Sequence, residues 1–249
     1  MINNFPSGAE SFSQKFRRLF TEFGYLSFKM SKFEEYELYA KNKDFLVSDR
    51  VITFNDTNGK LLALKPDVTL SIIKNTEDAP GIKTKLCYDE KVYRPSGSTH
   101  RFKEITQIGL ECIGDIDLYD IYETVDIAAH ALSLVDESFV FGLSHLGVLS
   151  AVLSDFGADD EFAFKIMKLV SEKNSHDILK LCEEQGLDKT AAKTLAAFTE
   201  IHGNRKKVLE RLSKLGLGKN AEKALLELKE LSNLLENSDF SDKIEFDFS

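Results

Sequence analysis

The spacing of apolar residues changes between a helical and a strand-like period along the chain, and each change predicts an element. Near the N-terminus an aromatic stripe recurs every three or four residues, which predicts an amphipathic helix with one face on the core. This stripe consists of Phe12, Phe16, Leu19, Phe20 and Phe23. Two short segments at 51–55 and 60–64 then flank Asn58-Gly59, a dipeptide that favours a tight β-hairpin.

A second, longer hairpin is predicted by strand-like segments at about 84–93 and 101–112, which a polar loop joins. A helix from about 118 to 135 follows, and after it come a strand near 138–143 and a helix near 146–156. Antiparallel strands with helices packed beside them are typical of the α+β class. We therefore predict a mixed, mainly antiparallel sheet that is flanked by helices.

The pattern changes again from about Asp159, where helical periodicity continues without strands. Glycines occur in this stretch at positions typical of turns and helix ends, namely Gly186, Gly203, Gly216 and Gly218. The last residues, KIEFDFS, again have a strand-like pattern. These changes predict a first part at 1–157, an all-helical segment at 158–241, and a strand at 242–249 that returns to the first part.

The composition is that of a globular protein, and it narrows the range of partners. The chain has 249 residues, of which 43% are hydrophobic, and its formal net charge is −9. It has no apolar run near the roughly 20 residues of a membrane span and no secretory signal pattern, so we expect a cytoplasmic protein that does not enter membranes. The acidic excess argues against nucleic-acid binding. We expect the densest basic cluster, at 202–207, to be a solvated face among helices.

The three cysteines predict neither a disulfide framework nor a metal site. Cys87, Cys112 and Cys182 are odd in number and lack the spacing of metal ligands. Cys87 and Cys112 lie in strand-like segments and are most simply core residues. The helical part has no nucleophile motif and no phosphate-binding glycine loop. We expect no catalytic residue in the helical part, and no metal and no cofactor.

The longer hairpin carries the candidate chemistry. Alternate side chains of a strand share a face, so Gln107, Gly109 and Glu111 point the same way. Gly109 would leave room for a ligand between an amide and a carboxylate. Glu111 suits an ammonium group, and Arg94 suits a carboxylate or a phosphate. Taken singly, each charged residue is more often a solvated or salt-bridged surface group, so the weight comes from their occurring together.

The segment from Lys85 to Gly114 resembles motif 2 of class II aminoacyl-tRNA synthetases, most closely that of the histidyl branch, with its arginine, variable loop and Gln-x-Gly-x-Glu. Three further blocks match in order: 23–39 looks like a motif 1 region, 61–69 like the branch's substrate-binding turn, and 117–132 like the helix after motif 2. The resemblance implies the class II synthetase fold, with the helical segment as an insertion. It implies histidine-binding roles for Asp67, Thr69, Arg94, Gln107 and Glu111.

Two positions depart from the synthetase pattern, and both concern ATP. Ser96 stands where the synthetases have a glutamate that recognises adenine, and Ile105 stands where they have an aromatic residue that stacks on it. An aliphatic side chain has no π face, and base stacking contributes about 1–3 kcal/mol per base. With Lys65-Pro66-Asp67 in the substrate turn, the sequence is most similar to the synthetase paralogue that acts as regulatory subunit of short-form ATP phosphoribosyltransferase.

This second resemblance implies a non-catalytic, allosteric protein of histidine biosynthesis. It implies a hetero-oligomer with a separate short catalytic subunit, histidine as the effector, and a homodimer through the motif 1 region. In the family the last strand leads to a tyrosine-containing segment and to motif 3, which the sequence does not include, so aminoacylation by this chain alone is not expected. Two alternatives are the catalytic core of a histidyl-tRNA synthetase and a free-standing amino-acid-binding module.

Overall fold

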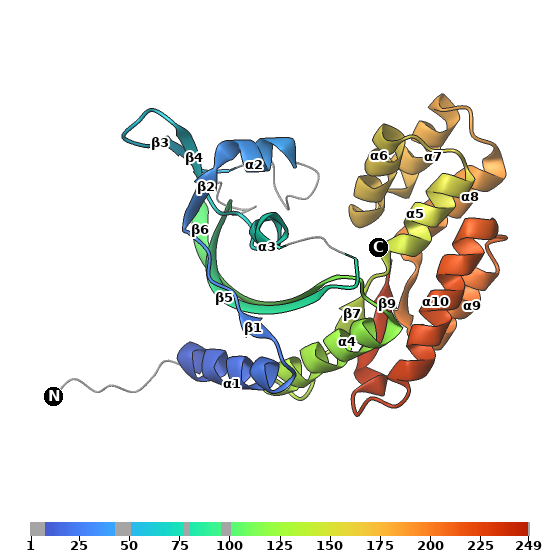
Figure 1. Cartoon of the computed structure of the whole chain (residues 1–249). Helices are drawn as coiled ribbons and strands as arrows, with labels where there is room; N and C mark the ends of the chain where they lie inside the picture. Colours follow the sequence, from blue (N-terminus) through green and yellow to red (C-terminus); the bar gives the residue numbers. More distant parts are fainter. Residues whose placement is uncertain (1–7, 43–50, 77–79, 96–100, 249) are drawn as a thin grey trace. The chain divides into compact units, whose positions relative to one another are not determined.

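The computed structural model describes residues 8–42, 51–76, 80–95 and 101–248, and its elements are labelled in Figure 1. The chain divides into two compact units, Met1–Val135 and Asp136–Ser249. The two units meet at 135/136, whereas the sequence analysis places the end of the first part at 157. The predicted boundary concerns the family's core and its insertion, and it stays a prediction.

A long antiparallel hairpin of β5 (Lys83–Pro95) and β6 (Phe102–Gly114) organises the first unit. Its register runs from Lys83 opposite Gly114 to Pro95 opposite Phe102. Both strands of the longer predicted hairpin are therefore confirmed. A short strand, β1 (Leu26–Ser27), pairs in parallel with β5, on the side away from β6.

One face of the hairpin is covered by α1 (Gly8–Glu22) and α4 (Leu118–Ser133), as Figure 1 shows. Phe20 of α1 is buried there in one cluster with Cys87 of β5. The two helices agree with the predicted ones. The aromatic stripe is only partly buried, however, because α1 ends before Phe23, which is 41% exposed.

The opposite face of the hairpin is covered by α3 (Thr69–Asn75), around which the hairpin curves in Figure 1. Val68 and Ile72 pack there against Tyr88 and Val92 of β5. Burial of such side chains stabilises the contact by roughly 1.5–3 kcal/mol for each residue. The packing holds the segment before α3 against the hairpin, on the face that carries the candidate residues.

A small antiparallel sheet completes the first unit, with β4 (Leu61–Leu64) between β2 (Phe33–Glu35) and β3 (Thr53–Asn55). It confirms the shorter predicted hairpin around Asn58-Gly59. The glycine has a φ of +81°, in the left-handed region that side chains other than glycine rarely adopt. α2 (Tyr36–Lys41) follows β2 directly.

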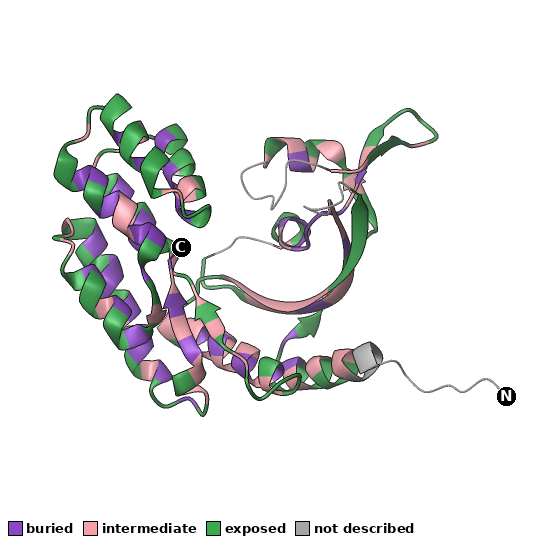
Figure 2. Cartoon of the chain, turned by 180° about the vertical axis from the view of Figure 1, so that it is seen from behind, coloured by how far each residue is buried: buried purple, intermediate pink, exposed green. Residues whose placement is uncertain are grey.

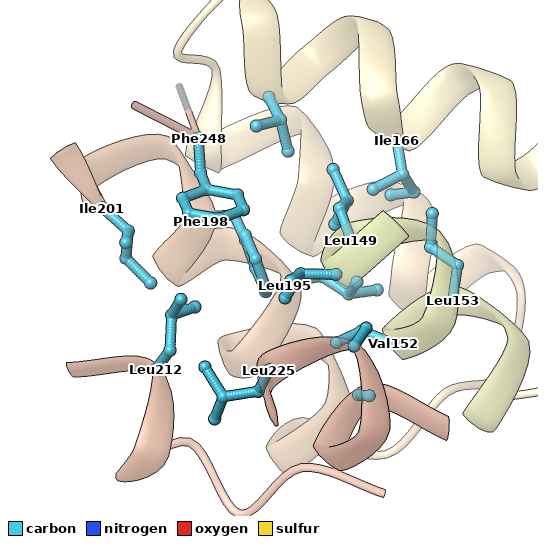
Figure 3. Packing of buried hydrophobic residues seen from close by; sticks show 14 of the residues in the cluster. Leu149, Val152, Leu153, Ile166, Leu195, Phe198, Ile201, Leu212, Leu225 and Phe248 are labelled. Atoms are coloured by element: carbon cyan, nitrogen blue, oxygen red, sulfur yellow. The ribbon is translucent and has the colours of Figure 1, made fainter. Parts of the chain in front are cut away.

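The second unit is mainly helical, as its periodicity predicts, and has a large apolar core. In Figure 2 its helices carry buried residues along one side and exposed residues along the other. Figure 3 shows Ile166, Leu195 and Phe198 among the side chains that fill this core. The helices are α5 (Leu146–Asp155), α6 (Asp160–Ser171), α7 (Ser175–Glu184), α8 (Lys189–Ala197), α9 (Arg205–Ser213) and α10 (Lys219–Leu235), with short 3-10 helices at Phe198–Glu200 and Ser241–Lys243.

A three-stranded sheet lies in the second unit, with β9 (Ile244–Asp247) between β7 (Phe141–Leu143) and β8 (His202–Asn204). β7 pairs with β9 in parallel and β8 pairs with it antiparallel. The prediction of a helical segment without strands is therefore wrong at His202–Asn204. Three residues are too few to show a strand period, and the strand forms because β9 offers it a backbone edge.

The basic cluster at 202–207 is not wholly a solvated face. Arg205 is only 4% exposed, and its guanidinium donates to the backbone oxygens of Ser232 (3.0 Å) and Ser241 (3.1 Å) and to the Ser241 hydroxyl (2.6 Å). A buried charged group needs such partners, because leaving it without them costs several kcal/mol. The prediction is wrong for Arg205, which ties α9 to the chain ahead of β9.

None of the described helices has both the length and the apolarity that a membrane crossing requires. Within the same ranges, His, Cys, Asp and Glu side chains form no group of three or more that could hold a metal ion. All three cysteines are free thiols, and Cys87 and Cys182 are buried.

Candidate functional site

The candidate residues of the hairpin lie on the face that packs against α3. In the observed register Tyr88 is opposite Gly109 and Glu90 is opposite Gln107. Tyr88 is buried against α3, so its partner Gly109 faces the same way. Alternation then places Gln107 and Glu111 on this face too, as the sequence predicts. We call this surface the site face.

The segment before α3 brings two more candidate residues to the site face. The Thr69 hydroxyl donates a hydrogen bond of 2.8 Å to Oε1 of Glu111. Asp67 is 9% exposed, and its Oδ1 accepts a hydrogen bond of 3.2 Å from the backbone N–H of Leu70. The predicted substrate turn therefore meets the Gln-x-Gly-x-Glu segment of β6 at Glu111.

Arg94 connects this turn with the hairpin. Its Nε donates to the backbone oxygen of Pro66 at 2.8 Å, and its Nη2 donates to Oε1 of Gln107 at 3.2 Å. The same Nη2 lies 3.6 Å from Oδ2 of Asp67. Side-chain contacts thus join the five residues that the sequence singles out in two sets on the site face, Thr69 with Glu111 and Arg94 with Gln107 and Asp67. The bond to Pro66 also gives Arg94 a structural role.

Sequence reasoning missed one residue that contacts the candidate residues, Tyr88. The side-chain amide of Gln107 donates to the Tyr88 hydroxyl at 3.2 Å. A Cβ atom built on Gly109 would lie 2.5 Å from the Tyr88 hydroxyl oxygen, which is closer than real contacts allow. The space that we expected Gly109 to leave for a ligand is therefore occupied, next to the glycine, by Tyr88. The cross-strand pairing of Tyr88 with Gly109 is the signal that finds it, and it requires the register.

Burial determines the ionisation of the site. Burial raises the pKa of Glu111, the hydrogen bond from Thr69 opposes the shift, and the nearby Asp67 adds to it. Burial likewise raises the pKa of Tyr88 to about 12, and the Glu111 charge contributes, so Tyr88 is a neutral phenol at pH 7. Among the described residues no cation forms an ion pair with Glu111. A partly buried carboxylate without a counter-charge favours a ligand that brings a positive group.

A buried ion pair lies beside this group. Lys65 is 1% exposed and its ammonium contacts Glu90, the residue opposite Gln107. The Lys29 ammonium lies 3.6 Å from the same carboxylate. Two backbone hydrogen bonds fix the chain at Lys65: the N–H of Tyr93 donates to the carbonyl oxygen of Lys65, and the N–H of Lys65 donates to the carbonyl oxygen of Lys32. The Lys65 ammonium is therefore already paired, and it stabilises the turn instead of facing a ligand.

Of the two positions that depart from the adenine-binding pattern of the synthetases, the structure describes only Ile105. Ile105 lies opposite Val92 and is 41% exposed, on the face of the hairpin that also carries Gln107. Its aliphatic side chain offers no stacking surface there. Ser96 lies outside the described residues.

Two kinds of known protein are similar to this chain in sequence. The ATP phosphoribosyltransferase regulatory subunit of Caldanaerobacter subterraneus is 28% identical over 238 residues, which cover 94% of this chain and 61% of that protein. The histidine–tRNA ligase of Methanocaldococcus jannaschii is also 28% identical, over 230 residues that cover 89% of this chain and 53% of that protein. The chain thus spans little more than half the length of these relatives.

Solved structures show the same fold. The ATP phosphoribosyl transferase (HisG:HisZ) complex from Thermotoga maritima contains a chain that matches with a TM-score of 0.66 at 20% identity, covering 98% of this chain and 82% of that one. The fold is the α+β fold of class II synthetases, with mostly antiparallel strands, as predicted. The family model for histidyl-tRNA synthetase matches residues 7–249. The chain belongs to the histidyl-tRNA synthetase family.

Proposed function

We propose that this chain is a non-catalytic regulatory subunit of ATP phosphoribosyltransferase that binds histidine on the site face. The observation that carries the proposal is Glu111, a partly buried carboxylate that accepts from Thr69 and has no ion pair among the described residues. The α-ammonium of an amino acid supplies the missing charge. The choice of histidine rests on family membership.

The other candidate residues suit the rest of an amino acid. Arg94 presents a guanidinium that is held by Pro66 and Gln107 and is available to a carboxylate. Asp67 and Gln107 flank it on the site face. The site face thus carries two carboxylates, Asp67 and Glu111, and one guanidinium, Arg94. The carboxylate of Glu111 suits the ammonium end of a zwitterion, and Arg94 suits its carboxylate end.

The regulatory role needs a partner, and the relatives suggest which one. The Caldanaerobacter relative is named a regulatory subunit, and the Thermotoga structure is a complex of two kinds of subunit. We therefore infer a cytoplasmic hetero-oligomer with a short catalytic subunit, and a homodimer through the motif 1 region at 23–39. Nucleic acid is not part of this assembly.

Histidine would act by differential affinity. If the effector binds one state of the hetero-oligomer more tightly than the other, it shifts the equilibrium between them. A coupling free energy of about 1–3 kcal/mol, which corresponds to roughly 5–150-fold in affinity, is typical of such regulation. The chain itself performs no chemistry in this proposal.

Aminoacylation is the second candidate function, because a histidine–tRNA ligase is as similar in sequence as the regulatory subunit is. It would require adenine to bind beside Ile105, without an aromatic surface. Histidine-dependent exchange of pyrophosphate into ATP by the full chain would establish this function. Exchange at the background rate would exclude it.

The experiment that tests the regulatory role measures phosphoribosyl-ATP formation by the short catalytic subunit of the same organism. The rate is followed with and without this chain, while histidine is titrated. Activation on mixing that histidine reverses would support the proposal. An unchanged rate with both proteins folded would contradict it. If the chain still binds histidine in that case, the remaining interpretation is a free-standing amino-acid-binding module.

A further inference from the structure

The hydrogen bonds around Gln107 have a fixed direction. The guanidinium of Arg94 has only donors, so the atom of Gln107 that faces it must be the carbonyl oxygen Oε1. The amide nitrogen Nε2 then faces the other way, toward Tyr88, and donates to its hydroxyl oxygen. Tyr88 is therefore the acceptor in this bond, and its own hydroxyl hydrogen points elsewhere.

The position of that hydrogen is restricted because the ring cannot move freely. Tyr88 is 8% exposed and is packed with Val68, Ile72 and Val92. Its hydroxyl lies over Gly109, where a Cβ atom would be only 2.5 Å from the hydroxyl oxygen, so a larger residue at 109 would have to displace it. Within the described ranges no residue accepts a hydrogen bond from the Tyr88 hydroxyl. A buried phenol usually has an acceptor, since leaving a donor without one costs about 1–3 kcal/mol.

We propose that Tyr88 is a ligand-binding residue of this site, whose hydroxyl donates a hydrogen bond to an acceptor atom of the bound amino acid. The inference rests on the proposed binding of an amino acid to the site face. It adds a neutral donor to the charges of Glu111 and Arg94. The hydroxyl would donate to a carboxylate oxygen or to an unprotonated ring nitrogen of the ligand, and it disfavours an apolar or N–H-bearing atom at the same place.

The protonation state of the Tyr88 hydroxyl determines which ligands it favours. At pH 7 the phenol is neutral and keeps its hydrogen, because its pKa is raised to about 12. The donor is therefore present over the whole physiological range of pH. A ligand atom that fits it gains a hydrogen bond, whereas a ligand without an acceptor leaves the donor buried and unpaired.

The test compares Tyr88→Phe with Tyr93→Phe in the full chain. Tyr93 lies on the same strand, but its hydroxyl donates to the exposed Glu104 at 3.0 Å. Circular dichroism and thermal unfolding verify that both variants fold. Calorimetry or competition then measures the binding of L-histidine, of histamine, which lacks the carboxylate, and of 3-(2-thienyl)-L-alanine, whose ring has no nitrogen.

We expect Tyr88→Phe to weaken histidine binding about tenfold and Tyr93→Phe to leave it unchanged, in keeping with the loss of one buried hydrogen bond. The loss should vanish for one analogue. If it vanishes for histamine, the acceptor is the carboxylate; if it vanishes for thienylalanine, the acceptor is a ring nitrogen. Wild-type affinity in Tyr88→Phe, or an equal loss with all three ligands, would overturn the assignment while leaving the proposed function intact. Failure of the wild-type chain to bind histidine would overturn both.

Discussion

Two charged side chains, one in each unit, show how differently the units use burial. Arg205 in the second unit is buried and has three hydrogen bonds to Ser232 and Ser241. Glu111 in the first unit is partly buried and accepts one hydrogen bond, from Thr69. A fully partnered charge has a structural role, whereas a carboxylate with one neutral partner retains the capacity to bind a cation. The buried charge of the second unit therefore contributes to stability, whereas the carboxylate of the site face is free to serve the proposed ligand.

The largest effect on stability should come from the apolar core of the second unit. Phe198 is fully buried and its ring meets Phe248 edge-on at 5.9 Å between centroids. Phe198→Ala removes this packing and should lower the free energy of unfolding by about 3–5 kcal/mol. Chemical denaturation checks the value. A loss below about 1 kcal/mol would show that this core does not stabilise the fold.

Removal of the partnered charge should cost somewhat less. Arg205→Ala leaves the oxygens of Ser232 and Ser241 without their donors, and we expect a loss of roughly 2–4 kcal/mol in the free energy of unfolding. Lys206→Ala is the matched control. Lys206 is the next residue along the chain, but its side chain is exposed and should contribute less than about 0.5 kcal/mol. Equal effects of the two substitutions would contradict a structural role for Arg205.

The smallest stability effect, and one of opposite sign, should come from Glu111→Gln. The pKa of Glu111 is raised in the folded state above its ordinary value of 4.5, so the folded protein holds this proton more tightly than the unfolded chain. The wild-type stability contribution of Glu111 is therefore complete below about pH 4.5 and is lost as pH rises through the raised pKa.

Glu111→Gln should not show this loss, so its stability relative to the wild type should increase with pH in the absence of histidine. Unfolding measured from pH 4 to pH 8 checks the trend. Glu104→Gln, on the same strand but exposed and paired with Lys91, is the control for a surface carboxylate. A relative stability of Glu111→Gln that stays constant with pH would show that Glu111 is not desolvated in the fold.

The sequence predicted the elements better than it predicted the contacts between them. Both hairpins and the long helices follow from apolar periodicity and from the turn at Asn58-Gly59, because these signals are local. The short strand at 202–204 was missed, because it depends on β9, which lies far along the chain. Burial of Arg205 was missed for the same reason, since its partners lie 27 and 36 residues away.

In the candidate site, too, contacts between distant segments were harder to predict than local features. Family resemblance singled out five residues in advance, and side-chain contacts join them in two sets on the same face, Thr69 with Glu111 and Arg94 with Gln107 and Asp67. Their proposed role in binding histidine stays a prediction. Tyr88 could not be found without the register that places it opposite Gly109, and a single sequence does not fix that register.

The measurement that tests the central claim most directly is a calorimetric titration of histidine into the full chain and into Glu111→Ala. If the Glu111 carboxylate holds the ammonium group, the substitution should weaken binding by about 1.5–3 kcal/mol, which is roughly 10–150-fold. Glu104→Ala should bind as the wild type does. An unchanged affinity for histidine in a folded Glu111→Ala protein would contradict the assignment of the site.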